Sequence, residues 1–318
     1  MILNNYNFAK YFIENYKLEN KPYIAVAVSG GPDSMALLNM MMHLSKKINA
    51  KIIALIVNHN LRQNSKSEVS WLFNKLSIKK ISCKIIDIKK NHIFKRNMEE
   101  ARKNRYKRLL NYCKKNNILH LCLAHHYDDI KETYLIRKIS GSNFYGLRPM
   151  EKLSVNKHVC IIRPLLNFKK KQIYKYNSLN KIEFIEDPSN FNLTYSRSCV
   201  RKFIKDNKSF VRFINKDIRI INENVPLYNE VIWNFIISVI ESINSKQISV
   251  NYNKFINSDV ILKENAISKF YKFLYGDTKN VRYQKIAILL KELETKRFKL
   301  FVLKSMKITK KENFLIFI

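Results

Sequence analysis

The stretch Ser29-Gly30-Gly31-Pro32-Asp33-Ser34 decides the fold of this chain, because it joins two runs of different periodicity. Residues 23–28 before it are continuously apolar, as in a buried strand, and residues 35–44 after it carry apolar side chains at helical spacing. In such a strand–turn–helix unit, the free backbone N–H groups and the helix dipole both favour an anion at the helix N-terminus. Two adjacent glycines let that anion approach the backbone without a Cβ in the way. The stretch therefore predicts a phosphate-binding loop.

The polar side chains of this loop extend the prediction. The hydroxyls of Ser29 and Ser34 can donate to phosphate, and the carboxylate of Asp33 can hold a hydrated Mg²⁺ ion. The alternative is an ordinary turn in which a serine or an aspartate caps the helix. Only five glycines occur in the chain, so an adjacent pair at a strand end favours the phosphate interpretation. The chain has no Walker A loop, because Gly146 is followed by Leu147-Arg148 where that motif requires lysine and a hydroxyl residue.

Length and cysteine content indicate a globular protein of a reducing compartment. A chain of 318 residues can bury a sizeable core and is expected to form two domains. Its apolar runs are too short to span a bilayer and residues 1–10 are too polar for a secretory signal, so we expect no membrane segment and a cytoplasmic location. The five cysteines are well separated and form no C-x-x-C motif, which argues against a structural zinc or an iron–sulfur cluster.

The charge balance points to a polyanionic partner. The chain carries 59 basic and 25 acidic residues, for a net charge of +34. Such an excess attracts polyanions, and nucleic acid is the first candidate. The alternative is compositional: the chain is rich in Lys, Asn and Ile and poor in Ala and Gly, as AT-rich coding would make it. We therefore treat the charge as support for a nucleic-acid partner.

Short β-branched runs alternate with amphipathic ones in the first part of the chain. The expected strands are 23–28, 51–57, 81–88, 118–124 and 158–162, and the expected helices are 33–47, 65–76, 98–115, 128–139 and 168–179. This alternation predicts an α/β fold, a parallel twisted sheet with helices on both faces. Ligands of such sheets bind at the carboxyl ends of the strands, so side chains that follow strands are expected to converge on one crevice.

The pattern changes after about residue 212. We expect a catalytic domain over residues 1–212, a helical linker over 213–246 and a small basic α/β domain over 247–318. Short β-like runs at 298–303 and 314–318 belong to the last of these. No internal repeat or low-complexity tract is evident.

Charged side chains follow several of the predicted strands. His59 comes directly after the second strand, where it suits a nucleotide or an anion, with a polar loop as the alternative. Arg102 and Arg105 lie on one face of the helix 98–115, where they could hold phosphates or form a solvated basic face. Arg197 and Arg201, four residues apart on an expected helix, form a stripe suited to phosphates, with a surface helix as the alternative.

The segment 125–133 after the fourth strand is the densest cluster of titratable groups in the chain. Asp129 and Glu132 are three residues apart, share a helical face and could hold the amine of a substrate. Acidic residues in a first turn also stabilise the helix dipole without any further function. His125 and His126 could instead ligate a metal, although adjacent residues do not normally share a helical face.

The chain carries seven motifs in order: S-G-G-x-D-S (29–34), H-x-L-R (59–62), A-R-x-x-R-Y (101–106), H-H-x-D-D-x-x-E-T (125–133), G-S and G-L (141–142 and 146–147), R-P-L-L (163–166) and D-P-S-N (187–190). Taken together, they resemble those of the tRNA(Ile)-lysidine synthetases of the PP-loop ATP pyrophosphatase superfamily, over roughly residues 20–205. The first motif marks only the superfamily, and the set in this order points to the lysidine branch. The chain departs from the family pattern at Asn58, where Asp is usual, and at Asn192 and Ser198, and its last third matches poorly.

The resemblance implies an enzyme that uses ATP and Mg²⁺ to ligate free L-lysine to C2 of the wobble cytidine of CAU-anticodon isoleucine tRNA, through an adenylated base. It implies that ATP is bound by Ser29, Gly30, Gly31, Pro32, Asp33, Ser34, His59, Arg102 and His125, with Mg²⁺ on Asp33. Catalytic roles fall on Asp33, Arg105, Asp129 and Glu132, the last two holding the amine of lysine. tRNA contacts fall on Arg163, Tyr195, Arg197 and Arg201. The oligomeric state stays open, a homodimer included.

Three rival functions share the phosphate loop. A tRNA thiolase needs reactive sulfur, usually from paired cysteines, and no C-x-x-C motif exists here. A small-molecule amide ligase or amidotransferase has little use for a net charge of +34. A nucleotide-binding module without catalysis has no need of Asp33 together with Asp129 and Glu132, and pyrophosphate release would distinguish it from an enzyme.

Overall fold

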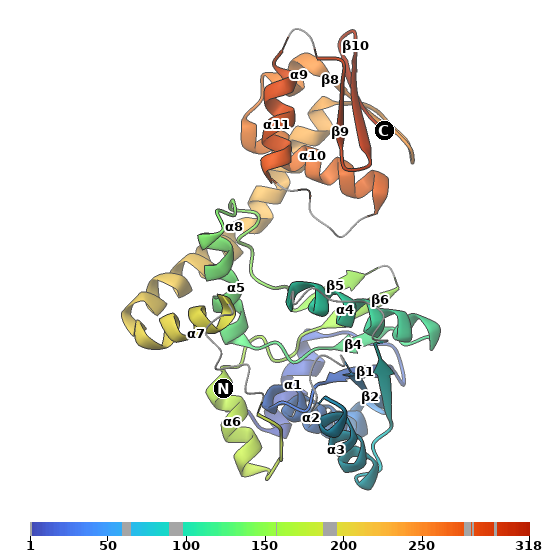
Figure 1. Ribbon diagram of the computed structural model, residues 1–318, viewed down its shortest axis with the longest axis vertical. Coiled ribbons are helices and arrows are strands. Elements are labelled where there is room, and N and C mark those ends of the chain that lie inside the picture. Colours follow the sequence, from blue (N-terminus) through green and yellow to red (C-terminus); the bar gives the residue numbers. More distant parts are fainter. Residues whose placement is uncertain are drawn as a thin grey trace. The chain divides into compact units, whose positions relative to one another are not determined.

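The computed structural model describes residues 2–58, 65–88, 98–156, 158–186, 196–276, 281, 283–295 and 298–318. The chain forms two compact units, Met1–Asn222 and Glu223–Ile318 (Figure 1). The boundary lies inside the long helix α8 (Lys208–Val239), later than the expected domain boundary at residue 212. Among the described residues, no helix is both long and apolar enough to cross a membrane.

The first unit contains a six-stranded sheet with the order β3-β2-β1-β4-β6-β5. Its strands are β1 (Tyr23–Val28), β2 (Lys51–Asn58), β3 (Cys83–Asp87), β4 (His120–Cys122), β5 (Leu153–Asn156) and β6 (Val159–Ile162). The pairs among β3, β2, β1, β4 and β6 are parallel, which confirms the expected parallel sheet. The edge strand β5 was not expected: it pairs antiparallel with β6, as the first arm of a hairpin.

Helices cover both faces of this sheet, as expected. They are α1 (Asn5–Asn15), α2 (Pro32–Ile48), α3 (Ser65–Ile78), α4 (Met98–Lys115), α5 (Tyr127–Ile139), α6 (Lys170–Leu179) and α7 (Ser196–Asp206). Alternate residues of β1 supply two cores, with Ile24 and Val26 packed with α1 and α2 on one face and Ala25 packed with α4 on the other. Figure 1 shows α1 and α2 on one side of the sheet and α4 on the other. The carboxyl ends of the parallel strands are thereby left to loops.

The second unit is built around an antiparallel sheet with the order β7-β8-β11-β10-β9. Its elements are β7 (Ile240–Ile243), β8 (Ile248–Asn251), α9 (Tyr252–Ile256), α10 (Val260–Tyr275), α11 (Tyr283–Leu293), β9 (Leu300–Leu303), β10 (Met306–Lys311) and β11 (Phe314–Phe317). The expected strands 298–303 and 314–318 correspond to β9 and β11. The segment 213–246, expected as a helical linker, holds most of α8 and the first strand of this sheet. A separate apolar core, which includes Phe255, Ile267 and Phe317, holds the unit together.

Candidate active site

The predicted phosphate loop follows β1 and is closed by its own serines. The Ser34 hydroxyl donates to the Gly31 carbonyl at 3.0 Å, and its Oγ accepts from the Ser29 N–H at 3.1 Å. The two hydroxyl oxygens are 3.2 Å apart. Pro32 then begins α2 at its first position, where a missing N–H costs nothing. The loop is thus held in one shape before any ligand arrives, which reduces the entropy lost on binding.

Two features require glycine at position 30: its backbone conformation and the close approach of Ile185. Its φ of +82° lies in the left-handed region, and a Cβ there would lie 3.3 Å from Cδ1 of Ile185. The Gly30 carbonyl also accepts from the Ile185 N–H at 2.9 Å, so the segment after α6 is bonded to the loop. A side chain at this position would strain the loop and push against that segment.

We predict that Gly30→Ala weakens ATP binding at least about tenfold and destabilises the fold by about 1–2 kcal/mol. Gly141→Ala is the matched control, because Gly141 has a φ of +70° but open space around its missing Cβ. Gly141→Ala should lower the free energy of unfolding by a similar amount and leave the affinity for ATP unchanged. Calorimetric titration with ATP and urea unfolding of both variants check this, and equal losses of ATP affinity in the two variants would contradict it.

Buried His126 joins the phosphate loop to the first turn of α5. Its side chain is 3% exposed, and its Nε2 lies 3.7 Å from an oxygen of Asp33 and 3.7 Å from an oxygen of Asp129. The His126 backbone N–H also donates to Asp129 at 3.0 Å. Side chains from the ends of β1 and β4 therefore meet, as expected for the carboxyl edge of the sheet. His126 was not among the predicted site residues, and it is the one around which the carboxylates gather.

Asp33 and Asp129 have opposite acid–base character within this cluster. Burial raises the pKa of Asp33, and the charge of Asp129 adds to that effect, against the opposing influence of His126 and of Lys170. Burial also opposes ionisation of Asp129, but His126 and His125 outweigh it and lower the pKa of this carboxyl. Asp129 is therefore a fixed anion, while a bound cation would favour the ionised form of Asp33.

Glu132 lies one turn further along α5 and is paired with α7. Its Oε1 accepts from Nε of Arg201 at 2.6 Å, although the two residues are 69 positions apart. Its Oε2 is buried and has no hydrogen-bond partner among the described residues. Burial raises the pKa of Glu132, and Arg201 opposes that shift. One carboxylate oxygen thus remains to accept a bond from a ligand.

Arginines from α4 and α7 gather on the same site. Burial lowers the pKa of Arg105, and the nearby charges of Arg102 and Arg197 lower it further. Burial and Arg102 likewise lower the pKa of Arg197. Guanidinium groups that depress one another's pKa repel each other, and a polyanion bound between them would relieve that repulsion. The cluster suits a polyanion, and the predicted roles of Arg102 and Arg105 toward ATP and of Arg197 toward tRNA stay predictions.

His125 is held as a neutral side chain beside this cluster. Its Nε2 lies 3.2 Å from a guanidinium nitrogen of Arg102, and because arginine only donates, Nε2 must be the accepting, unprotonated nitrogen. Burial lowers the pKa of His125 to about 3, helped by Arg102, Arg163 and Arg105 against the opposing charge of Asp129. The two adjacent histidines therefore serve different partners. No group of three metal-ligating side chains occurs among the described residues, so their geometry does not support the metal alternative.

The depressed pKa of His125 predicts a measurable pH dependence of stability. In the unfolded chain the imidazole titrates near its ordinary value of about 6.5, whereas in the folded protein its pKa is about 3. Between these values the unfolded state binds more protons, so the stabilisation present above pH 6.5 is lost as the pH falls. From pH 7 to pH 5 the wild type should lose about 1–2 kcal/mol more unfolding free energy than His125→Gln, which does not titrate. Urea unfolding at both pH values measures this, and parallel losses would contradict it.

Three predicted residues are placed differently or lie outside the described residues. Arg163 is 9% exposed, and its guanidinium donates to the Glu151 carbonyl at 2.9 Å and to the Ser154 hydroxyl at 3.0 Å. These bonds fasten β5 and its approach to the end of β6, so Arg163 has a structural role and its tRNA contact stays a prediction. His59 and Tyr195 lie outside the described residues.

Asn58 ends β2, at a position where the tRNA(Ile)-lysidine synthetases that the motifs resemble usually have aspartate. Its buried side-chain amide donates to the carboxylate of Asp87 at 2.9 Å, and the two residues are register partners on β2 and β3. An aspartate at this position would face another carboxylate. The departure at Asn58 is thus matched by an acid on the neighbouring strand.

We predict that Asn58→Asp lowers the unfolding free energy by about 1–2 kcal/mol at pH 7, because two carboxylates then meet at hydrogen-bond distance. The repulsion raises the pKa of the new carboxyl, so the loss should shrink as the pH falls. The double variant Asn58→Asp/Asp87→Asn reverses donor and acceptor and should recover most of the stability. Urea unfolding at pH 7 and pH 4 tests both expectations, and equal stability of the single and double variants would exclude the pairing.

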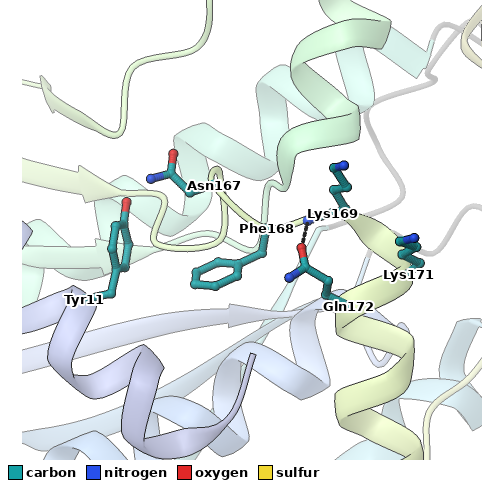
Figure 2. A pocket seen from close by; sticks show the side chains of 6 residues that line it. All are labelled: Tyr11, Asn167, Phe168, Lys169, Lys171 and Gln172. Carbon is teal, nitrogen blue, oxygen red and sulfur yellow. Dashed lines mark hydrogen bonds between the residues drawn. The ribbon is translucent and has the colours of Figure 1, made fainter. Parts of the chain in front are cut away.

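A pocket of about 450 Å³ lies at the N-terminus of α6 (Figure 2). It is lined by Tyr11, Asn167, Phe168, Lys169, Lys171 and Gln172. Close to it, the Lys170 N–H donates to Asp128 at 2.7 Å, which ties α6 to the first turn of α5. None of the predicted site residues lines this pocket. The candidate active site is instead the cluster formed by the phosphate loop, the first turns of α5, and the arginines of α4 and α7.

The fold and this cluster define an ATP-binding protein with a phosphate loop at the end of its first strand. Residues 4–208 match the PP-loop domain, and the chain belongs to this family. A solved relative in fold is the U34-tRNA thiolase NcsA from Methanococcus maripaludis with its [4Fe-4S] cluster, with a TM-score of 0.57 and 19% identity. That similarity covers 69% of this chain and 77% of the thiolase, and it shows a shared fold.

The curated relatives are tRNA(Ile)-lysidine synthases, which confirms the resemblance seen in the motifs. The enzyme of Wolbachia pipientis wMel is 41% identical over 194 residues, which is 59% of this chain and 44% of the relative. The enzyme of Rickettsia bellii (strain OSU 85-389) is 30% identical over 280 residues, which is 84% of this chain and 63% of the relative. The chain therefore spans less than two thirds of the length of these relatives.

Proposed function

We propose that this chain uses ATP to join lysine to C2 of the wobble cytidine of an isoleucine tRNA with a CAU anticodon, which changes its codon reading from AUG to AUA. The observation that carries the proposal is the convergence of Asp33 from the phosphate loop and Asp129 from α5 on His126. The substrate class comes from relatives named tRNA(Ile)-lysidine synthases. The acids and arginines of the cluster supply groups for the two halves of this chemistry.

In the first half, the phosphate loop and the arginines bind ATP. Backbone N–H groups of the loop and the Ser29 hydroxyl hold the part that departs as pyrophosphate. Arg102 and Arg105 offset the charge that develops on the phosphates. The C2 oxygen of the base attacks the α-phosphorus, the bond to pyrophosphate breaks, and the base is left carrying AMP. We assign a nucleotide contact to neutral His125, which lies next to Arg102.

The residues present fit Mg²⁺ at Asp33. Its Oδ1 is buried and has no hydrogen-bond partner among the described residues, and burial raises the pKa of its carboxyl, so a bound cation would stabilise the ionised form. Mg²⁺ in phosphate sites uses one or two carboxylates, with water and phosphate as its other ligands. Bound there, the ion would offset negative charge on the phosphates.

In the second half, Asp129 and Glu132 hold the ε-amine of lysine. Asp129 is a fixed anion that attracts the ammonium group, and the raised pKa of Glu132 suits it to accept a proton from that group. The free amine then attacks C2, a C–N bond forms, and the bond from C2 to the oxygen that carries AMP breaks. Arg201 keeps Glu132 in place through its bond to Oε1.

The remaining partners follow from charge and from the family. With a net charge of +34, the chain attracts the tRNA backbone. We assign tRNA contacts to Arg197 and Arg201 beside the site and to basic residues of 247–318. The proposal includes a cytoplasmic location, where tRNA, lysine and ATP are all available.

A thiolase is the rival that shares most with this chain. All five cysteines lie within the described residues, and no three metal-ligating side chains gather there. Burial raises the pKa of Cys122 far above its ordinary range, so this thiol is a poor nucleophile. The cysteine arrangement therefore favours ligation over sulfur transfer.

Pyrophosphate release tests the first half of the proposal. The purified chain with ATP and Mg²⁺ should release pyrophosphate when CAU-anticodon isoleucine tRNA is added, and not when a CAU-anticodon methionine tRNA is added. If no pyrophosphate is released with either tRNA, the chain is a nucleotide-binding module without catalysis. Release that depends on a small molecule without tRNA would indicate an amide ligase.

A further inference from the structure

We propose that three exposed phenylalanines, Phe203 of α7 and Phe210 and Phe213 of α8, form a platform on which unpaired bases of the tRNA anticodon loop stack. The inference rests on the proposed function, because it concerns the RNA surface next to the same site. These three residues are called the aromatic platform below.

The rings of the aromatic platform contact one another at the surface. The centroids of Phe203 and Phe210 are 5.6 Å apart at 81°, and those of Phe210 and Phe213 are 6.3 Å apart at 42°. The three residues are 43%, 41% and 65% exposed. Single exposed apolar residues are ordinary, whereas three adjoining rings form a patch that water solvates poorly.

The aromatic platform is not part of the core of these helices. Val200 on α7 and Ile214 and Ile218 on α8 are the buried apolar residues near the platform. The phenylalanines keep 41–65% of their surface exposed, and none of the three is among the residues of the apolar cores. Covering their exposed ring surface with a bound base would therefore be favourable, because it removes apolar surface from water.

Cations surround the aromatic platform. Residues 196–222 hold eight basic and two acidic residues. Lys202, Lys205, Lys208 and Arg212 are all exposed, and each lies within two residues of one of the phenylalanines in the sequence. Aromatic rings interleaved with exposed cations are the arrangement that binds single-stranded nucleic acid, since bases stack on the rings while phosphates meet the cations. An apolar protein partner would leave these cations desolvated without a counter-charge.

The aromatic platform belongs to the helices that complete the active site. Phe203 lies two residues beyond Arg201, which bonds to Glu132, so its side chain projects from the opposite side of α7, one helix diameter (~10 Å) from that bond. On α8, Asn215 accepts a hydrogen bond from the Tyr127 hydroxyl at 3.0 Å, and Tyr127 is the first residue of α5. Figure 1 shows α7 beside α5. Bases that flank the modified cytidine would thus find the platform within the reach of a short single strand.

Binding of an RNA hairpin tests the aromatic platform without requiring lysidine formation. The probe is a fluorescent hairpin with the CAU anticodon in its unpaired loop, titrated with the full chain and followed by anisotropy. Phe203→Leu/Phe210→Leu/Phe213→Leu keeps the apolar surface but removes the π-faces, and it should raise Kd about tenfold or more. The corresponding Trp variants should bind at least as tightly as wild type. Tyr6→Leu, which removes another exposed aromatic ring, is the matched control.

Each outcome decides for or against the aromatic platform. Wild-type hairpin affinity in the triple Leu variant would overturn it, as would an equal loss of affinity for a fully paired RNA. A wild-type dimer that becomes monomeric in the triple variant would assign the face to a second copy of the chain. If the wild type forms no lysidine but the variant loses loop binding, the proposed function fails and the platform stands.

Discussion

Replacing Asp33 with asparagine is expected to reduce tRNA-dependent pyrophosphate release by about a thousandfold, because the site loses its cation-binding charge. Asp33 is the only acid of the phosphate loop, and its Oδ1 is buried without a partner among the described residues. The substitution keeps the shape of the side chain, so the loop should remain folded. Steady-state release of pyrophosphate, measured over a range of Mg²⁺ concentrations, checks this.

Asp128→Asn is the control, since it makes the same change in the same cluster. Lys131 bonds to Oδ1 of Asp128, and the Lys170 N–H donates to its Oδ2. Both oxygens thus already serve the fold. This variant should lose stability but keep pyrophosphate release within about tenfold of wild type. Comparable losses of release in the two variants would show that Asp33 holds no special role.

Replacing Glu132 with glutamine is expected to separate the two halves of the reaction. Transfer of lysine should fall about a hundredfold, because the ammonium group loses a charged acceptor, while tRNA-dependent pyrophosphate release persists. Glutamine can still accept the bond from Arg201, so the contact between α5 and α7 is kept. Parallel assays of pyrophosphate and of labelled lysine in tRNA measure the split.

Glu14→Gln, on the exposed side of α1, is the matched control and should change neither half. Raising the lysine concentration should restore only the part of transfer that Glu132→Gln loses through weaker lysine binding, and not the part lost with the proton acceptor. If Glu132→Gln loses both pyrophosphate release and lysine transfer, Glu132 serves adenylation or folding.

Much of the first unit could be predicted because its signals are local. The apolar run 23–28, the glycine pair and the helical periodicity after them are enough to predict β1, the loop and α2. The edge strand β5 gave no such signal, because residues 153–156 are half polar and become a strand only by pairing with β6. The helices of the second unit, α10 and α11, were expected only as parts of an α/β domain without bounds, because lysines obscure the apolar spacing of this region.

The site was harder to predict where it depends on distant contacts. The motif His125-His126 does not show which ring points at the carboxylates, and only the β4–α5 turn decides that it is His126. The bond between Arg201 and Glu132 joins positions that no spacing rule connects. Arg163 appeared equivalent to the other arginines in the sequence, and its burial against β5 distinguishes it. Tertiary packing, rather than residue type, assigned these roles.

Transfer of radiolabelled lysine tests the proposed function most directly. The full chain is mixed with ATP, Mg²⁺, labelled lysine and CAU-anticodon isoleucine tRNA, with a CAU-anticodon methionine tRNA in a parallel reaction. The proposed function predicts alkali-stable label in the isoleucine tRNA alone, and none with Asp33→Ala. Pyrophosphate release without any lysine label, or equal labelling of both tRNAs, would contradict it.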